Sequence, residues 1–196
     1  MMGRLLAMSP GAVEREVDGI RTIEPTYGLP AVWITTNAKQ EAQMSGYTVV
    51  DPATVITTHI KETIRRHAHE LLGRQEVQAL VDKFKETNPK VVEELIPNML
   101  SLGKVQKVMQ NLLKDNISIR DLRTILEQLS DYSAMTKDAD ILTEYVRQAL
   151  ARSITKQYQT ADGTVIVLTL EKGVEDIIER SVQKTDVASY LALEPN

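Results

Sequence analysis

The sequence predicts an α+β protein, with an irregular α/β part at the N-terminus, a central all-helical bundle and the start of a second α/β unit at the C-terminus. Three observations lead to this fold class. Short β-prone runs separated by proline and glycine fill the first 50 residues. Apolar residues at helical spacing, in stripes preceded by capping residues, recur from residue 51 to about residue 152. A β-branched run then follows the Asp162-Gly163 turn signal.

In the N-terminal part, strands are expected at residues 4–8, 19–23, 31–35 and 47–50, and a short helix at residues 38–45. Proline and glycine separate the first of these segments, which marks them as short elements joined by turns. The N-terminal part should therefore form a small sheet with a helix beside it.

A long amphipathic helix is expected to follow directly. Asp51 is a good N-cap residue, and Pro52 suits the first helical position because its missing N–H would have no partner there. We expect this helix to run to Gly73. The apolar stripe that would face a core consists of Val55, Ile56, Ile60, Ile64, Ala68 and Leu71.

Further helices, each with one apolar face, are expected up to about residue 152. The first carries a stripe from Val77 to Phe84, and Asn88-Pro89 begins the next, which Pro97 stops. The residues expected to cap three more helices are Ser101, Ser118 and Thr136. Because each stripe is narrow, these helices should share one core as a bundle.

The C-terminal unit is expected to begin with a strand over residues 164–170 and to continue with a helix that carries Val174, Ile177 and Ile178. A lone strand is not stable in water, and the remaining residues offer no second clear strand. The sequence therefore predicts either that the chain is cut from a longer protein or that this strand pairs with the N-terminal strands.

The composition is that of a folded globular protein and disfavours several classes of partner. Hydrophobic residues make up 42% of the 196 residues and aromatic residues only 4%, so Leu, Ile and Val must fill the core. The net charge of -4 gives little electrostatic reward for binding nucleic acid. Because the chain has no cysteine and no run of about 20 apolar residues, we expect it to be soluble, free of disulfides and cytoplasmic.

No motif for catalysis, a cofactor or a metal stands out, so we expect a protein that is not an enzyme and needs no cofactor. The sequence has no Gly-rich phosphate loop and no Gly-x-Ser-x-Gly elbow. The histidines are His59, His67 and His69, which on one helix point apart or lie too far apart to share a metal ion. A hydrolase whose residues converge only in three dimensions is left open.

Two basic features could suggest binding of an anion or of nucleic acid. Arg65 and Arg66 have Glu62 and Glu70 nearby, and we interpret them as members of ordinary surface ion pairs. Residues 101–130 resemble a helix-turn-helix, the basis of an alternative function as a helical nucleic-acid-binding regulator. Its DNA-contacting residues would be Arg120 and Arg123, with Asp121 and Glu127 opposing them on the same helix. Packing in a helical bundle is favoured, and no nucleic-acid partner is expected.

Five segments of the chain together resemble the cytoplasmic region of the flagellar export-gate family FlhA. They are residues 22–34, 46–55, 67–77, 118–127 and 142–152. Each segment is modest by itself, but they occur in order and at family-like spacing over nearly the whole chain. Residues 49–54 and 71–76 resemble the flagellar branch more than its sister branch, the export gate of virulence injectisomes, which is the alternative assignment.

The resemblance implies a larger bacterial protein on the cytoplasmic face of the inner membrane. Its N-terminal half would be a membrane-spanning channel, absent from this chain, and its cytoplasmic half four subdomains that assemble as a nonameric ring. By this resemblance, residues 1–47 are most of an inserted second subdomain and residues 48–72 a helix of the first. Residues 73–152 would be the third, helical subdomain, and residues 153–196 the truncated start of the fourth.

The resemblance also implies a docking site for complexes of an export chaperone with its late substrate, beside other partners in the export gate and the export ATPase. The family marks this dimple with an Asp and a Phe in a proline-containing turn and a Thr near a helix start. Here these positions fall on Glu24, Tyr27 and Thr54. Our hypothesis is an apolar dimple around Tyr27 with a polar rim of Glu24 and Thr54.

Overall fold

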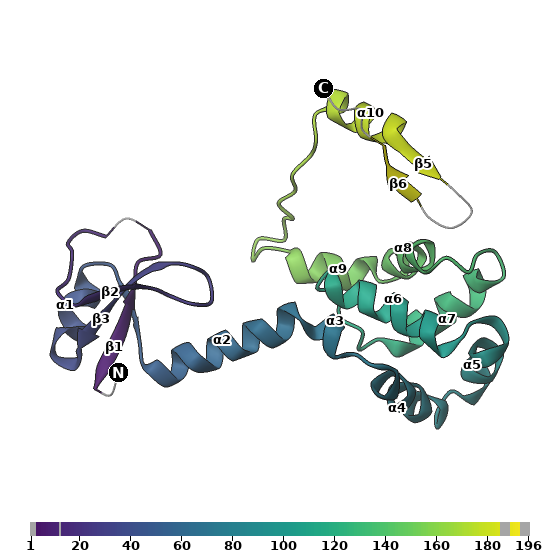
Figure 1. Ribbon diagram of the computed structural model, residues 1–196, viewed down its shortest axis with the longest axis horizontal. Helices are drawn as coiled ribbons and strands as arrows, with labels where there is room; N and C mark the ends of the chain where they lie inside the picture. The colour runs from purple at the N-terminus through teal and green to yellow at the C-terminus, as the bar shows by residue number, and fades with distance from the viewer. Residues whose placement is uncertain (1–2, 12, 185–188, 193–196) are drawn as a thin grey trace. The chain divides into compact units, whose positions relative to one another are not determined.

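The computed structural model describes residues 3–11, 13–184 and 189–192, and it confirms the α+β class (Figure 1). The chain divides into two compact units, Met1–Leu150 and Ala151–Asn196. The finer division expected at residues 47, 72 and 152 stays a prediction.

The N-terminal part forms a four-stranded antiparallel sheet in the order β2-β3-β1-β4. Its strands are β1 (Arg4–Met8), β2 (Ile20–Ile23), β3 (Pro30–Thr35) and β4 (Thr48–Val50), and helix α1 (Lys39–Met44) precedes β4. These bounds confirm the expected strands and short helix to within about a residue.

Both faces of this sheet carry apolar side chains, because residues along a strand alternate between its two faces. On one face, Ala7 and Ile34 pack with Ala42 of α1 and with Tyr47. On the other, Leu6 and Ala31 pack with Val55. The sheet thus lies between α1 and the helix that follows β4.

Helix α2 (Pro52–Arg66) begins where the sequence predicts, since the Asp51 carboxylate accepts a hydrogen bond from the Thr54 N–H at 2.9 Å. The expectation of one helix to Gly73 is wrong. His67 leaves the helical conformation at φ −106° and ψ 14°, and a short helix, α3 (Ala68–Leu71), follows it.

The apolar stripe expected along this helix is mostly uncovered within the described residues. Val55 is buried at 8% exposure, whereas Ile56, Ile60 and Ile64 are each more than half exposed. The helical pattern is present, but only its first turn meets a core.

The helical bundle is confirmed. It consists of α4 (Arg74–Lys85), α5 (Pro89–Glu94), a π-helical turn (Leu95–Met99), α6 (Leu102–Lys114), α7 (Leu122–Ser133) and α8 (Ala139–Ala149). Side chains from α4 and α6 to α8 have no more than 1% exposure and form its core. They include Val77, Val81, Val105, Met109, Leu112, Ile125, Leu126, Leu129 and Leu142.

Of the three residues expected to cap α6, α7 and α8, one is confirmed. Ser101 caps α6, since its hydroxyl oxygen accepts a hydrogen bond from the Lys104 N–H at 3.3 Å. Asp121, not Ser118, caps α7, and Asp138, not Thr136, caps α8. In both cases the predicted hydroxyl accepts from the residue two positions later, and the carboxylate takes the helix N-terminus, where a negative charge is favoured.

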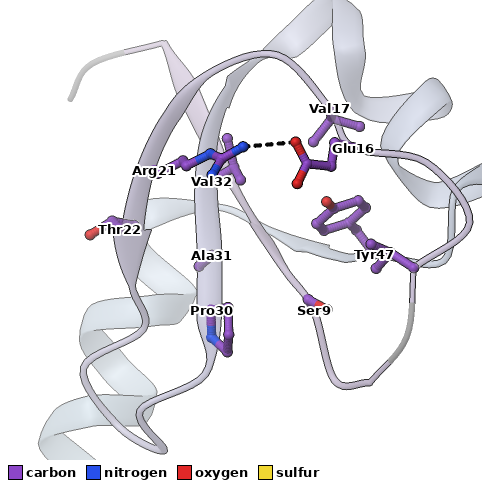
Figure 2. A pocket seen from close by; sticks show the side chains of 10 residues that line it. Ser9, Glu16, Val17, Arg21, Thr22, Pro30, Ala31, Val32 and Tyr47 are labelled. Carbon is purple, nitrogen blue, oxygen red and sulfur yellow. Dashed lines mark hydrogen bonds and ion pairs between the residues drawn. The ribbon is translucent and has the colours of Figure 1, made fainter.

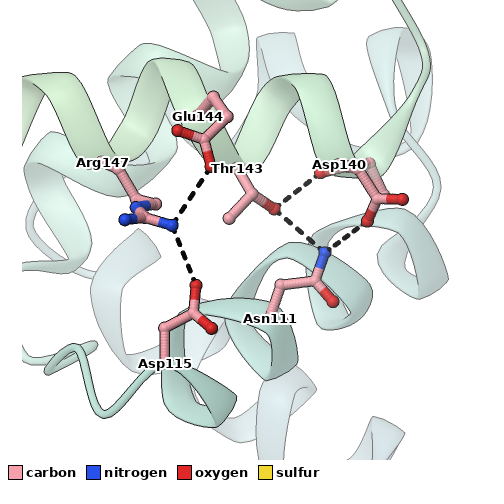
Figure 3. Close-up of polar contacts among 7 residues, drawn as sticks. Asn111, Asp115, Asp140, Thr143, Glu144 and Arg147 are labelled. Carbon is pink, nitrogen blue, oxygen red and sulfur yellow. Dashed lines mark hydrogen bonds and ion pairs between the residues drawn. The ribbon is translucent and has the colours of Figure 1, made fainter. Parts of the chain in front are cut away.

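A polar network joins α6 to α8 on the surface of the bundle (Figure 3). Asn111 donates to the Asp140 carboxylate at 2.8 Å and to the Thr143 hydroxyl at 3.2 Å. Arg147 lies 3.1 Å from a carboxylate oxygen of Asp115. These side chains satisfy one another, which suits a structural link between two helices.

The second unit departs most from the sequence prediction. It contains α9 (Ala151–Tyr158), α10 (Lys172–Ser181) and an antiparallel pair, β5 (Val182–Lys184) and β6 (Ser189–Leu191). The hairpin was not predicted. The expected strand over residues 164–170 is wrong, because within the described residues it forms only an isolated bridge between Gln159 and Val165.

Candidate functional site

The predicted site begins with the turn between β2 and β3, residues 24–29, which Glu24 organises. The Glu24 N–H donates to the Leu29 carbonyl at 2.8 Å, and the Glu24 carbonyl accepts from the Gly28 N–H at 3.0 Å. The two carboxylate oxygens of Glu24 accept from the N–H groups of Thr26, at 2.8 Å, and Tyr27, at 2.7 Å. Gly28 has φ +70°, a conformation that favours glycine.

Glu24 therefore builds the turn instead of offering a free carboxylate at its rim. The residue is only 3% exposed. Burial raises the pKa of Glu24, but the hydrogen bonds from Thr26 and Tyr27, with help from the charge of His59, outweigh burial and lower the pKa below its ordinary value. The carboxylate of Glu24, expected as a polar anchor for a partner, is thus ionised, but its two oxygens already accept hydrogen bonds within the turn.

Tyr27 and Thr54 are placed differently from Glu24, because both are exposed. Tyr27 is 58% exposed at the tip of the turn. Thr54, in the first turn of α2, donates its hydroxyl hydrogen to a carboxylate oxygen of Asp51 at 2.7 Å. Its hydroxyl oxygen can still accept a hydrogen bond.

All three predicted residues line one pocket of about 180 Å³ between the turn, the sheet and α2. The other lining residues are Met8, Pro10, Leu29, Thr48, Val50, Val55 and Thr58. A cavity of about 150 Å³ can hold a benzene-sized group, so this pocket can take an apolar side chain. The structure thus brings together Glu24 and Thr54, which lie 30 positions apart in the sequence.

Sequence reasoning missed several residues around this pocket. Met8 and Thr58 lie outside the segments that resemble the family, and only the tertiary structure places them at the pocket. Arg66 was interpreted as a surface ion-pair residue, but its guanidinium donates to the Thr26 carbonyl at 2.9 Å. Glu70 instead lies 2.7 Å from His67. No local signal distinguishes Arg66 from Arg65, because the partner lies 40 residues away.

A second pocket, of about 310 Å³, lies beside the sheet near Tyr47 (Figure 2). At its edge, Arg21 and Glu16 form an ion pair at 2.7 Å. Both side chains are more than 75% exposed, so the pair contributes little stability. None of the predicted site residues lines this pocket.

The described residues hold no metal-binding cluster. Among them, no group of three or more His, Cys, Asp or Glu side chains could hold a metal ion. Glu24 is the only buried acidic side chain in the described part of the chain, so the hydrolase alternative finds no buried carboxylate pair there. Arg123 of the proposed DNA-contacting helix donates to Asn88 at 2.8 Å, which places it in a contact within the bundle.

Comparison with known proteins supplies an independent view of the whole chain. The sequence profile of the FHIPEP family matches residues 1–196. The chain is 51% identical over 196 residues to the flagellar biosynthesis protein FlhA of Bacillus subtilis (strain 168), covering 100% of this chain and 29% of that protein. It is 41% identical over 181 residues to FlhA of Escherichia coli (strain K12), covering 92% of this chain and 26% of that protein.

Solved structures of similar fold include the cytosolic domain of EscV from the type III secretion system. The nonameric EPEC SctV-C structure matches with 30% identity and a TM-score of 0.75, covering 100% of this chain and 60% of that one. The structure of the Chlamydia pneumoniae CdsV protein matches with 30% identity and a TM-score of 0.82, covering 97% of this chain and 56% of that one. In the part of this chain that the structure describes, no helix is both long and apolar enough to span a membrane.

Proposed function

This chain belongs to the FHIPEP family of export-gate proteins, and on that premise we propose that it is a docking platform in the cytoplasmic part of a flagellar type III export gate. The chain spans less than a third of the length of its FlhA relatives, so the activity of a whole export gate is part of the proposal. The observation that carries the proposal is the meeting of Glu24, Tyr27 and Thr54 at one apolar pocket.

The pocket would capture a chaperone–substrate complex reversibly and deliver it to the membrane channel. An apolar side chain of the complex would enter the 180 Å³ pocket and cover the exposed ring of Tyr27. Burial of that ring would supply most of the binding affinity. The Thr54 hydroxyl would add specificity at the rim. Glu24 would act indirectly, by holding the turn. No covalent bond changes in this process.

The comparisons favour the flagellar branch over the injectisome branch. Identity reaches 51% and 41% to two FlhA proteins, against 30% to the SctV-C and CdsV structures. We therefore propose a role in flagellum assembly, with the injectisome export gate as the second candidate.

The proposal extends to assembly and location. The EPEC SctV-C and EscV cytosolic-domain structures are nonameric, and CdsV has been solved in complex with CdsO. By analogy, the intact protein would form a homo-oligomeric ring at the cytoplasmic face of the bacterial inner membrane. Its partners would be export-gate and export-ATPase components beside the chaperone–substrate complexes.

Calorimetric titration of the intact cytoplasmic region with a purified chaperone–substrate complex tests the docking site. We expect Tyr27→Ala to weaken binding by ~1–3 kcal/mol, the cost of truncating an aromatic hot spot. Tyr158→Ala is the matched control, since Tyr158 is similarly exposed, at 52%, but lies in the second unit. An affinity for Tyr27→Ala equal to that of wild type would reject the site.

A further inference from the structure

We propose that Arg66 is a positioning residue of the docking pocket, because it fixes the Tyr27 turn against α2. The consequence for binding rests on the proposed function, whereas the tie between turn and helix can be tested without any ligand.

The contact itself joins two distant parts of the chain. Arg66 is the last residue of α2, and its Nη2 donates to the Thr26 carbonyl oxygen at 2.9 Å. Thr26 is 4% exposed, so this carbonyl has little water to replace a lost donor. Among the described hydrogen bonds, the turn uses the carbonyls of Glu24 and Leu29 internally, and the Thr26 carbonyl accepts from Arg66 alone.

The internal hydrogen bonds of the turn fix its shape but not its position. Every bond that Glu24 makes stays within residues 24–29. The pocket has one wall on this turn, with Tyr27 and Leu29, and another on α2, with Thr54 and Thr58. Its width therefore depends on contacts that join the turn to the helix.

Arg66 supplies such a contact with a charged donor, and charged donors form stronger hydrogen bonds than neutral ones. The described residues show one other electrostatic link between turn and helix, the charge of His59 near Glu24. The geometry thus makes the Arg66 hydrogen bond the contact that fixes the distance between the turn and α2.

The neighbouring arginine provides a matched control. Arg65 is 62% exposed, and its ion pair with Glu62 has a nitrogen–oxygen distance of 3.9 Å. Arg65 has the same side chain, at the same end of the same helix, but makes no hydrogen bond to the turn among the described residues. Effects of helix-end charge alone should appear in both Arg65→Ala and Arg66→Ala.

Amide hydrogen exchange of the full chain, followed by NMR, tests the tie. The Thr26 and Tyr27 amides exchange only when the turn opens and leaves the Glu24 carboxylate. Because a turn that is no longer held against α2 opens more readily, we expect both amides to exchange about tenfold faster or more in Arg66→Ala, the effect of losing one charged hydrogen bond. Amides of the bundle core, such as Leu126 and Leu129, should keep their rates, which separates positioning from global destabilisation. Arg66→Lys should restore part of the protection, and Arg65→Ala should behave as wild type.

Binding of the chaperone–substrate complex separates this inference from the docking function. Fast exchange at the turn and a severalfold weaker affinity in Arg66→Ala support both. Fast exchange with wild-type affinity in both Arg66→Ala and Tyr27→Ala supports the tie and overturns the docking function. Wild-type exchange of Thr26 and Tyr27 in Arg66→Ala overturns the role of Arg66, whatever the affinity.

Discussion

Helices α6 and α10 carry similar sequence patterns and reach opposite outcomes. Both present apolar residues at helical spacing. In α6, Val105, Val108 and Leu112 are fully buried, because α4 and α8 pack against them. In α10, Val174, Ile177 and Ile178 are 37–59% exposed. An amphipathic pattern therefore predicts that a helix has an apolar face to bury, but not which segment will pack against that face.

The same contrast separates the two units. The bundle has many side chains of zero exposure, whereas none of the described side chains of residues 151–192 is buried. Leu168 is fully exposed and Ile166 is 83% exposed, in a run that the sequence marks as a strand. Helix α2 is intermediate, with one buried turn and three exposed isoleucines.

The largest expected effect is a direct test of this contrast. Leu126→Ala should lower the free energy of unfolding by ~2–5 kcal/mol, because it leaves a cavity in the bundle core. Leu168→Ala removes the same atoms from an exposed position and should change the free energy of unfolding by no more than about 0.5 kcal/mol. Chemical denaturation measures both. Equal losses would mean that residues 164–170 are covered in solution.

The next effect tests whether the N-terminal sheet is packed as tightly as the bundle. A Cβ on Gly19 would lie 2.5 Å from the Trp33 carbonyl oxygen and 2.7 Å from Val32 Cγ1. We expect Gly19→Ala to destabilise the protein by ~1–3 kcal/mol, the usual cost of overpacking. Gly11→Ala, whose Cβ meets nothing within 4 Å, is the control. Equal melting temperatures for Gly19→Ala and Gly11→Ala would show that the sheet can shift to accommodate the added methyl group.

A smaller effect concerns how the bundle helices begin. Asp121→Ala should cost ~1 kcal/mol, because the Thr124 N–H loses its acceptor at the start of α7. Ser118→Ala should cost less, since that hydroxyl accepts at 3.3 Å from Arg120 before the helix begins. Thermal unfolding of the two variants ranks the caps, and the reverse order would favour the cap predicted from sequence.

The smallest effect is confined to the Tyr27 turn and depends on pH. The pKa of Glu24 is lowered from its ordinary value of 4.5, so its stabilisation of the turn is complete above that value. It is lost as the pH falls through the lowered pKa. The Tyr27 amide signal should therefore titrate below pH 4.5, and in Glu24→Gln this titration should vanish. A midpoint above pH 4.5 in wild type would contradict the hydrogen bonding around Glu24.

Local signals predicted much of the unit of residues 1–150. Turn residues and β-prone runs gave the four strands, and Asp51-Pro52 gave the start of α2. The break at His67 and the hairpin of β5 and β6 had no comparable signal. The strand predicted over residues 164–170 was wrong although its sequence pattern was strong. No partner strand is described beside it, so it makes only an isolated bridge.

The candidate site shows the same division. Family resemblance selected Glu24, Tyr27 and Thr54, and the structure places them at one pocket. Resemblance could not say that Glu24 is buried with both oxygens occupied, or that Arg66 reaches Thr26. These facts depend on how the turn lies against a helix that begins 23 positions after the turn ends.

By itself, the sequence determined most of the helices and strands of residues 1–150, where most of them begin, and to which family the chain belongs. Capping, proline geometry and side-chain periodicity act over a few residues, so they can be read locally. Only the tertiary structure decided which apolar faces are covered and which polar groups are free, because burial and hydrogen bonding depend on segments that meet across long stretches of chain.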